Sequence, residues 1–428
     1  MTRRRGLVAV LLSLLLVGVS LVPAGAQGKK VTLLIHPTVY QITGGETGVI
    51  AAFSKRTGIE VEVVTLPIIQ LHEKAMVEWI AKSGRYDVVT ILDLYFNPTM
   101  SQNLEPLDPF LTGLPASYEF KDIILSLFDT MRIQGKSYGM PFQGGAVMLF
   151  YRKDLLEKYQ VAVPKSLDEL LAAGRKLTAG LRKDGGTDTY ALGVRGKEAN
   201  VGTQDFLVFF FAAGGNLFEK DGAQCGLNSP AGVITERFYA TAVKDGLVPK
   251  DLLAFGRDEL IGAFQQGRLA MAASFAPYYG QFNDPKNSKA AGSVGWTVIP
   301  TAPGVTPGRS FKNFWYMVMD RQSRNKDAAW ALMQELDGKA QQIEMASKWS
   351  FGPVRESAFR SAEVRKTFPH AEDWGRAVAA SVGIAHAEWP KMQDIIFEEH
   401  AGVLAGQQTP ERAVARMCER IQPLLGSR

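Results

Sequence analysis

Residues 138–155 read YGMPFQGGAVMLFYRKDL, and this stretch decides the fold. Pro141 interrupts the pattern that precedes it, and a glycine pair follows at 144–145. Residues 147–151 are then an apolar run of the length that a buried strand has. The glycine pair predicts either a plain bend or a close approach of backbone to a ligand. The pattern of strands and helices thus restarts after Pro141.

Upstream of this stretch, strand and helix patterns alternate. The predicted strands are residues 31–35, 59–63 and 86–92. The two predicted helices contain Val49 and Leu71 on their apolar faces. Alternation of this kind is typical of an α/β sheet that is covered by helices on both faces. The segment from His36 to Gly45 is polar and contains glycine, so it is expected to be a loop.

Downstream of the stretch, helix start signals recur. Ser166 and Glu169 have the spacing of a capping box, and Asn325 and Thr409 precede two further helical patterns. No low-complexity linker separates the two halves of the chain. The chain is therefore expected to form two α/β lobes that are joined by strand crossovers rather than by a flexible tether.

The first 26 residues are predicted to be a cleaved signal peptide. Arg3, Arg4 and Arg5 precede a 17-residue apolar stretch, and Ala24 and Ala26 then form an A-x-A cleavage site. An uncleaved anchor is the alternative, although 17 residues are at the lower limit for crossing a bilayer. Because no Cys follows the apolar stretch, a lipoprotein is not expected. The mature chain is expected to be periplasmic.

The charge of the chain argues against a nucleic-acid partner. The net charge of +5 falls to +2 once residues 1–26 are removed, because this segment carries three arginines and no acidic residue. No basic run remains in the mature sequence, so an acidic polymer is a poor candidate partner.

Motifs for catalysis are weak. Residues 135–139 match the G-x-S-x-G pattern of serine hydrolases, but Pro141 follows where that motif requires a helix. The segment around Gly135 is expected to be a hairpin turn instead. The five histidines lack zinc-ligand spacing, and a P-loop is absent. We therefore expect no catalytic residue, no metal and no cofactor, although a pair of carboxylates for glycan hydrolysis is defined by space and not by sequence.

The two cysteines, Cys225 and Cys418, are expected to be free thiols. No C-x-x-C motif is present, and two cysteines alone do not form a disulfide framework. A single disulfide stays open as the alternative, because an exported chain enters an oxidising compartment.

Several blocks of the sequence together resemble family 1 extracellular solute-binding proteins of ABC importers, the maltose-binding type. The matching blocks are Phe53–Val61, Tyr138–Phe142, Leu149–Leu155, Pro164–Leu170, Ala213–Phe218, Ala263–Met271 and Asn325–Trp330. No single block is decisive, but their order and spacing cover nearly the whole mature chain. One departure is residues 313–315, where many relatives carry a glycine pair, and it leaves the class of ligand open.

The resemblance implies a two-lobed periplasmic-binding-protein fold of type II, with a mixed sheet flanked by helices in each lobe. Residues 27–143 plus about 300–345 would form the N-terminal lobe, and residues 144–299 plus about 346–428 the C-terminal lobe. A sugar or polyol would bind in the cleft between the lobes and close them. The partners would be the permease subunits of an ABC transporter, and the binding protein itself would be a monomer.

A polar ligand that leaves water needs a hydrogen bond for each hydroxyl, so carboxylates, amides and aromatic rings are the candidates. From the first lobe and the crossing we select residues in loops or at strand ends: Tyr40, Glu46, Asp93, Gln143, Gly144, Asn313 and Trp315. From segments that resemble the family's cleft loops we select Ser274, Tyr278, Trp349, Phe351 and Arg355. Tyr278 is the candidate for stacking on a sugar face, with core packing as the alternative.

Three other functions remain compatible with the sequence. An exported glycan-acting hydrolase would need two carboxylates across the cleft. The same fold could bind a non-sugar solute such as a glycerol phosphate, for which Arg355 is the only cation among our candidates. It could also serve as a sensor subunit that presents the ligand to a membrane receptor.

Overall fold

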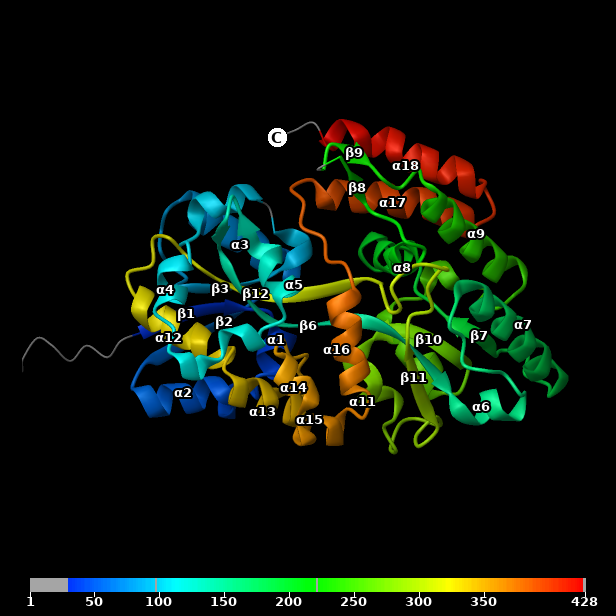
Figure 1. Ribbon diagram of the computed structural model, residues 1–428, viewed down its shortest axis with the longest axis horizontal. Coiled ribbons are helices and arrows are strands. Elements are labelled where there is room, and N and C mark those ends of the chain that lie inside the picture. The colour runs from blue at the N-terminus through cyan, green and yellow to red at the C-terminus, as the bar shows by residue number, and fades with distance from the viewer. Residues whose placement is uncertain (1–29, 97, 221, 426–428) are drawn as a thin grey trace, which may run out of the picture.

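The computed structural model describes residues 30–96, 98–220 and 222–425. The predicted signal peptide, residues 1–26, lies outside the described residues. The chain forms two α/β lobes with strands passing between them (Figure 1). Among the described residues, no helix combines the length and the hydrophobicity that a membrane crossing requires.

The sheet of the first lobe is mixed. Its strands are β1 (Lys30–Ile35), β2 (Glu60–Thr65), β3 (Val88–Leu92) and β12 (Lys312–Met319). β1 pairs in parallel with β2 and β3, whereas β12 is antiparallel to β3. β3 is buried along its whole length, as its apolar sequence predicts. Figure 1 shows α3 on one side of this sheet and α2 with α12 on the other.

The long strand β6 (Gly139–Arg152) passes from one lobe to the other. It contains the predicted strand at residues 147–151 but begins before Pro141, so the predicted interruption lies inside the strand. Residues 139–146 of β6 pair with β12 of the first lobe. Residues 147–152 pair with two strands of the second lobe, β10 (Leu269–Phe275) and β11 (Val294–Val298). β7 (Tyr190–Gly193) then pairs in parallel with β10 and makes this sheet mixed as well.

Helices flank both sheets. Those of the first part of the chain are α1 (Pro37–Gln41), α2 (Val49–Thr57), α3 (Ile68–Ile80), α4 (Asp108–Thr112) and α5 (Leu125–Phe128). The middle part contains α6 (Lys153–Lys158), α7 (Leu167–Lys183), α8 (Ala199–Ala212), α9 (Pro230–Lys244), α10 (Arg257–Gln265) and α11 (Tyr279–Phe282). The last part contains α12 (Lys326–Leu336), α13 (Lys339–Trp349), α14 (Glu356–Arg360), α15 (Ala362–Thr367), α16 (Ala371–Ala380), α17 (Trp389–Leu404) and α18 (Pro410–Leu425).

The segment expected to be a loop after β1 contains helix α1, so that prediction is wrong. Pro37 occupies the first turn, and the Nδ1 atom of His36 accepts the Thr38 N–H at 3.2 Å. Proline at this position loses no helical hydrogen bond. A helix of five residues is too short to show a hydrophobic period in the sequence.

Two of the predicted helix starts differ in detail. Ser166 caps α7 by accepting the Glu169 N–H at 3.2 Å, but the Glu169 carboxylate accepts the N–H of Lys165 instead of that of Ser166. Asn325 precedes α12 without a side-chain cap and donates its amide to the Asp87 carboxylate at 3.2 Å.

The segment with the G-x-S-x-G pattern is a hairpin, as expected. β4 (Arg132–Ile133) and β5 (Lys136–Ser137) pair antiparallel around Gly135, whose φ is 80°. Ser137 is buried and is followed by β6 rather than by a helix. The strand–turn–helix geometry of a hydrolase nucleophile is therefore not present at this serine.

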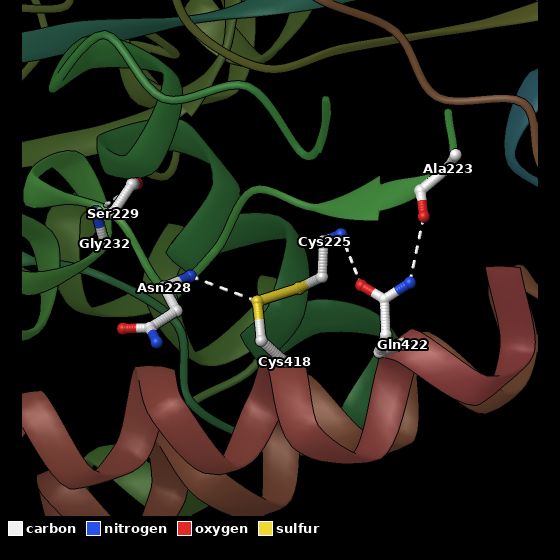
Figure 2. Close-up of a disulfide and its surroundings, with 7 residues drawn as sticks. All are labelled: Ala223, Cys225, Asn228, Ser229, Gly232, Cys418 and Gln422. Carbon is white, nitrogen blue, oxygen red and sulfur yellow. Dashed lines mark hydrogen bonds between the residues drawn. A yellow bond between two sulfur atoms is a disulfide. The ribbon is translucent and has the colours of Figure 1, made fainter. Parts of the chain in front are cut away.

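Cys225 and Cys418 form a disulfide, which corrects the expectation of two free thiols. Figure 2 shows the bond between β9 (Gln224–Cys225), paired with β8 (Phe218–Glu219), and the last helix α18. The Gln422 side chain accepts the Cys225 N–H at 3.1 Å and donates to the Ala223 carbonyl at 2.9 Å. The pairing is invisible in the sequence because 193 positions separate the two cysteines.

Candidate ligand-binding site

A cavity of about 570 Å³ lies between the lobes. Residues of both lobes line it, including residues of β6 and β12, and its volume is in the range of known small-molecule sites. The first lobe contributes His36, Thr38, Val39, Ile42, Ile68 and Leu92, and the strands β6 and β12 contribute Gln143, Gly144, Gly145, Asn313 and Trp315. The second lobe contributes three segments, which lie within residues 195–204, 256–259 and 275–281.

The first-lobe wall is apolar and aromatic. The ring of Trp315 lies 5.5 Å from that of His36 and 6.4 Å from that of His72, which in turn stacks on Tyr95 at 4.6 Å. Burial lowers the pKa of His72 to about 3. Burial also lowers the pKa of His36, with a smaller contribution from Arg257 across the cavity. Both imidazoles are therefore neutral at physiological pH.

The second-lobe wall carries a buried guanidinium. Arg195 is only 4% exposed, and its Nε and Nη2 atoms donate to the Asp205 Oδ1 atom at 3.0 and 2.8 Å. The backbone N–H of Arg195 donates to the other Asp205 oxygen. The ring of Phe275 lies 5.6 Å from the guanidinium carbon. Burial raises the pKa of Asp205, and the charge of Arg195 opposes this rise.

The other two cations of this wall are also paired within their own lobe. Lys197 lies 3.0 Å from Glu259, and Arg257 lies 2.8 Å from Asp258. The hydrogen bond from Lys197 lowers the pKa of Glu259. Glu198 is exposed and forms no ion pair in the part of the chain that the structure describes. The wall thus offers an incoming ligand no cation without a carboxylate partner among the described residues.

The N-terminus of α8 opens onto the same wall. Glu198 precedes this helix with φ 55° and ψ 155°, an uncommon conformation for a residue with a side chain, and it makes no side-chain cap. The first N–H groups of a helix have no partner within the helix. Asn200 and Val201 line the cavity in this first turn, and Gln204 donates its amide to Asn200 at 2.9 Å.

Five of the residues selected from the sequence line the cavity, namely Gln143, Gly144, Tyr278, Asn313 and Trp315. Gly144 lies against the backbone of two other segments. A Cβ added to Gly144 would meet the Asn313 carbonyl oxygen at 2.2 Å. The N–H of Gly144 donates to the Gly352 carbonyl at 3.2 Å. A glycine is required here for the crossing itself. Whether these five residues bind a ligand stays a prediction.

The other seven selected residues do not line this cavity in the described part of the chain: Tyr40, Glu46, Asp93, Ser274, Trp349, Phe351 and Arg355. Tyr40 is half-buried beside the exposed Glu46, and Ser274 is buried in β10. Phe351 is fully buried with its ring 5.1 Å from that of Phe142. Trp349 is half-buried and closes over Gly44.

Asp93 follows β3, as expected, but its carboxylate is engaged in the core. It is 1% exposed and accepts the Leu94 N–H at 2.9 Å and the Phe314 N–H at 3.1 Å. Burial raises the pKa of Asp93 well above its usual value, and burial lowers the pKa of the neighbouring Lys312 to about 8. The geometry gives Asp93 the role of fixing β12 against β3.

Arg355 is fully buried away from the cavity. Its Nε atom donates to the Asp337 carbonyl at 2.6 Å, and its Nη1 atom donates to the carbonyls of Tyr118 and Glu119 at 3.1 Å each. The ring of Tyr118 lies 4.6 Å below the guanidinium. These contacts tie the segment after α13 to the first lobe and leave Arg355 no route to a ligand in the cavity.

Sequence reasoning missed His36 and Arg195. Both follow the carboxyl end of a strand, His36 after β1 and Arg195 two residues after β7. The rule that selected Asp93 could therefore have selected them too. Among the described residues, no group of three or more His, Cys, Asp or Glu is placed to hold a metal ion.

Comparisons with known proteins place the chain in a family. Residues 41–343 match the model of the bacterial extracellular solute-binding proteins. A probable ABC transporter-binding protein of Deinococcus radiodurans is 25% identical, over 85% of this chain and 86% of its own length. A mannitol-binding protein of Pseudomonas aeruginosa is 26% identical, over 68% of this chain and 70% of its own.

Comparison with solved structures leads to the same family. The solved solute-binding protein of Thermotoga lettingae, bound to α-D-tagatose, is 25% identical with a TM-score of 0.74, over 93% of this chain and all of that one. The resemblance seen in the blocks of the sequence is thereby confirmed, together with the two-lobed fold. The chain belongs to the family of bacterial extracellular solute-binding proteins.

Proposed function

We propose that this protein captures an uncharged polyol or sugar in the cavity between its lobes and delivers it to the permease of an ABC transporter. The observation that carries the proposal is the charge balance of the cavity. Each of the three cations on the second-lobe wall already has a carboxylate partner on its own lobe. The first-lobe wall is aromatic and neutral.

The aromatic rings and the amides that line the cavity suit the two kinds of surface that a polyhydroxy ligand has. Trp315 and Tyr278 provide apolar area for C–H groups. Gln143, Asn313 and Gln204 provide amides for hydroxyl groups. The mannitol-binding relative and the tagatose-bound structure support this class of ligand.

An anionic ligand such as a glycerol phosphate fits the cavity less well. A phosphate would meet cations whose charge carboxylates already balance, and it would also meet the unpaired Glu198. Arg355, the cation considered for this role in the sequence, is engaged in the first lobe. A neutral ligand adds no negative charge to this balanced wall.

The proposal is binding without chemistry. The relatives are binding proteins, and a glycan hydrolase needs a carboxylic acid whose pKa is raised. Glu259 has a lowered pKa because Lys197 donates to it, and Asp258 is held by Arg257. A reducing-end assay on oligosaccharides incubated with the protein tests this part, and released reducing ends would contradict it.

We further propose that the mature chain begins at Gln27, resides in the periplasm, acts as a monomer and meets the permease subunits there. The pairing of β6 supports a division of the lobes close to the predicted one, since its partners change between Ala146 and Val147. N-terminal sequencing of the exported protein should give Gln27, and a start at Met1 in a membrane fraction would contradict it.

A thermal-shift screen tests the proposed ligand class. The panel is D-mannitol, D-sorbitol, ribitol, erythritol, D-tagatose and maltose, with glycerol 3-phosphate as the anionic comparison. At 100 times its Kd a ligand adds about 2.7 kcal/mol to the free energy of unfolding, which is visible as a shift in melting temperature. We expect at least one neutral member to bind and glycerol 3-phosphate not to bind. Binding of the phosphate alone would refute the proposal.

A further inference from the structure

We propose that Arg195 anchors the ligand by donating from its Nη1 atom to ligand hydroxyl oxygens, and that Asp205 is the positioning residue that directs this edge of the guanidinium into the cavity. The inference rests on the proposed function and adds to it the residue pair on which affinity depends. It follows from four features of the second-lobe wall.

The first feature is a buried cation with one free edge. Arg195 lines the cavity although it is only 4% exposed. Its Nε and Nη2 atoms are bonded to Asp205, whereas its Nη1 atom has no hydrogen-bond partner among the residues described. A guanidinium has five N–H donors in one rigid plane, so fixing one edge fixes the direction of the others. The Nη1 donors require an oxygen from a ligand or from water.

The second feature is the way in which Asp205 is held. Its side chain is fully buried in α8 and bonds both the side chain and the backbone N–H of Arg195. The Tyr239 hydroxyl donates to the backbone carbonyl of Asp205 at 2.8 Å. Leaving a buried carboxylate without its cation is costly, so the pair stays together whether or not ligand is present.

The third feature is the ring of Phe275, which lies 5.6 Å from the guanidinium carbon of Arg195. A ring contact on the guanidinium and a carboxylate at its edge leave the side chain little rotational freedom. The donors are thus oriented before the ligand arrives. Less conformational entropy is lost on binding, which raises affinity without a further contact.

The fourth feature is the first turn of α8 beside this guanidinium. Asp205 is on α8, so its bond places Arg195 against that helix. The cavity-lining Asn200 and Val201 belong to the uncapped turn, whose N–H groups have no helical partner. Two sets of donors near one another suit two adjacent hydroxyl oxygens. The ligand class is accordingly a polyol or sugar with a vicinal diol.

The first experiment is calorimetric titration of wild type and of Arg195→Lys with the neutral member of the panel that wild type binds most tightly. Lysine keeps the charge but cannot bond Asp205 at two nitrogens and still present a fixed donor. We expect the affinity for the polyol to fall at least tenfold, because losing a hydrogen bond from a charged donor lowers affinity by about tenfold or more. Arg195→Gln is the second variant should the lysine variant not fold.

The matched control is Arg355→Lys, which changes an equally buried arginine that does not line the cavity. This control should melt at a lower temperature but bind the same polyol within twofold of wild type. Wild-type affinity in both Arg195 variants would overturn the anchoring role and leave the proposed function intact. No binding of any neutral panel member to wild type would instead refute the proposed function, and this inference with it.

Asp205→Asn tests positioning, alone and combined with Arg195→Lys. Alone, it should weaken polyol binding several-fold, because a neutral amide holds the guanidinium less firmly. In the Arg195→Lys background it should weaken binding by less than twofold more, since a residue that acts through Arg195 has nothing left to position. A purely structural role would lower the melting temperature and leave affinity unchanged. That result, or a full additive loss in the double variant, would overturn the positioning role.

Discussion

Removing the disulfide should destabilise the protein without affecting the cavity. The bond between Cys225 and Cys418 spans 193 positions of the chain and ties α18 to β9. In the chain-entropy relation, a cross-link over so long a loop removes unfolded-state entropy worth about 5 kcal/mol, which is above the usual stabilisation of about 2–4 kcal/mol. We expect Cys225→Ala/Cys418→Ala to lose about 3–5 kcal/mol.

The same figure sets the expected shift in melting temperature. Unfolding entropy is about 2.1 cal/mol/K per residue, which is about 0.8 kcal/mol/K for a chain of roughly 400 residues that unfolds as one unit. The double variant should therefore melt about 4–6 °C below wild type by calorimetry. Dithiothreitol should lower the melting temperature of wild type by a similar amount and leave the double variant unchanged.

Ligand affinity supplies the internal control. Neither cysteine lines the cavity. Gln422, which is hydrogen-bonded to Ala223 and Cys225, does not line it either. Titration of the double variant with the best-binding polyol should match wild type within twofold. Two free thiols in denatured, non-reduced wild type would refute the pairing. An unchanged melting temperature in the double variant would refute the entropic argument.

Three further predictions concern the site, the closure and the pH response. Tyr278→Ala should weaken polyol binding about tenfold and Tyr278→Phe about threefold or less, because the ring supplies the contact; equal affinity of Ala and wild type in calorimetry would remove this ring from the site. Small-angle X-ray scattering should give a smaller radius of gyration for the protein with saturating polyol than for the protein without ligand, and an unchanged radius would refute closure. Burial raises the pKa of Asp337 from 3.8 to about 7, so the folded state binds this proton more tightly and stability should fall as the pH rises from about 4 to about 7. Denaturant titrations of Asp337→Asn should lack this component, and an identical pH profile for variant and wild type would contradict it.

The fold could be predicted from the sequence because its main elements are long and periodic. Only the second half of β6 could be predicted, because residues 147–151 form a continuous apolar run, whereas Pro141 and the glycine pair conceal the first half. α1 was not, because five residues give too few positions for a period. The disulfide could not be predicted either, because contact between positions 225 and 418 depends on how α18 packs against the second lobe.

The candidate site was only partly predictable, and the reason is geometric. The strand-end rule finds positions at one edge of a sheet but not the depth or direction of a side chain. Asp93, His36 and Arg195 all obey it. The Asp93 carboxylate turns inward and is bonded by the Phe314 N–H of the neighbouring strand, whereas the other two reach the cavity. What separates them is the partner that each side chain finds, which no spacing in the sequence encodes.

The crossing strands connect binding to closure. β6 is continuous between the lobes and is paired in both sheets, so the lobes cannot slide past one another without breaking one of these ladders. Bending β6 where its partners change preserves both ladders, which favours rotation about this point. Gly144 lies at this point with its backbone against Asn313 and Gly352, and Trp315 and Gln143 are paired one position away. Because Gln143, Gly144 and Trp315 also line the cavity, a ligand that contacts them would act directly on the point at which β6 bends. With the ligand held by Arg195 on the opposite wall, as proposed, we expect these contacts to favour the closed arrangement.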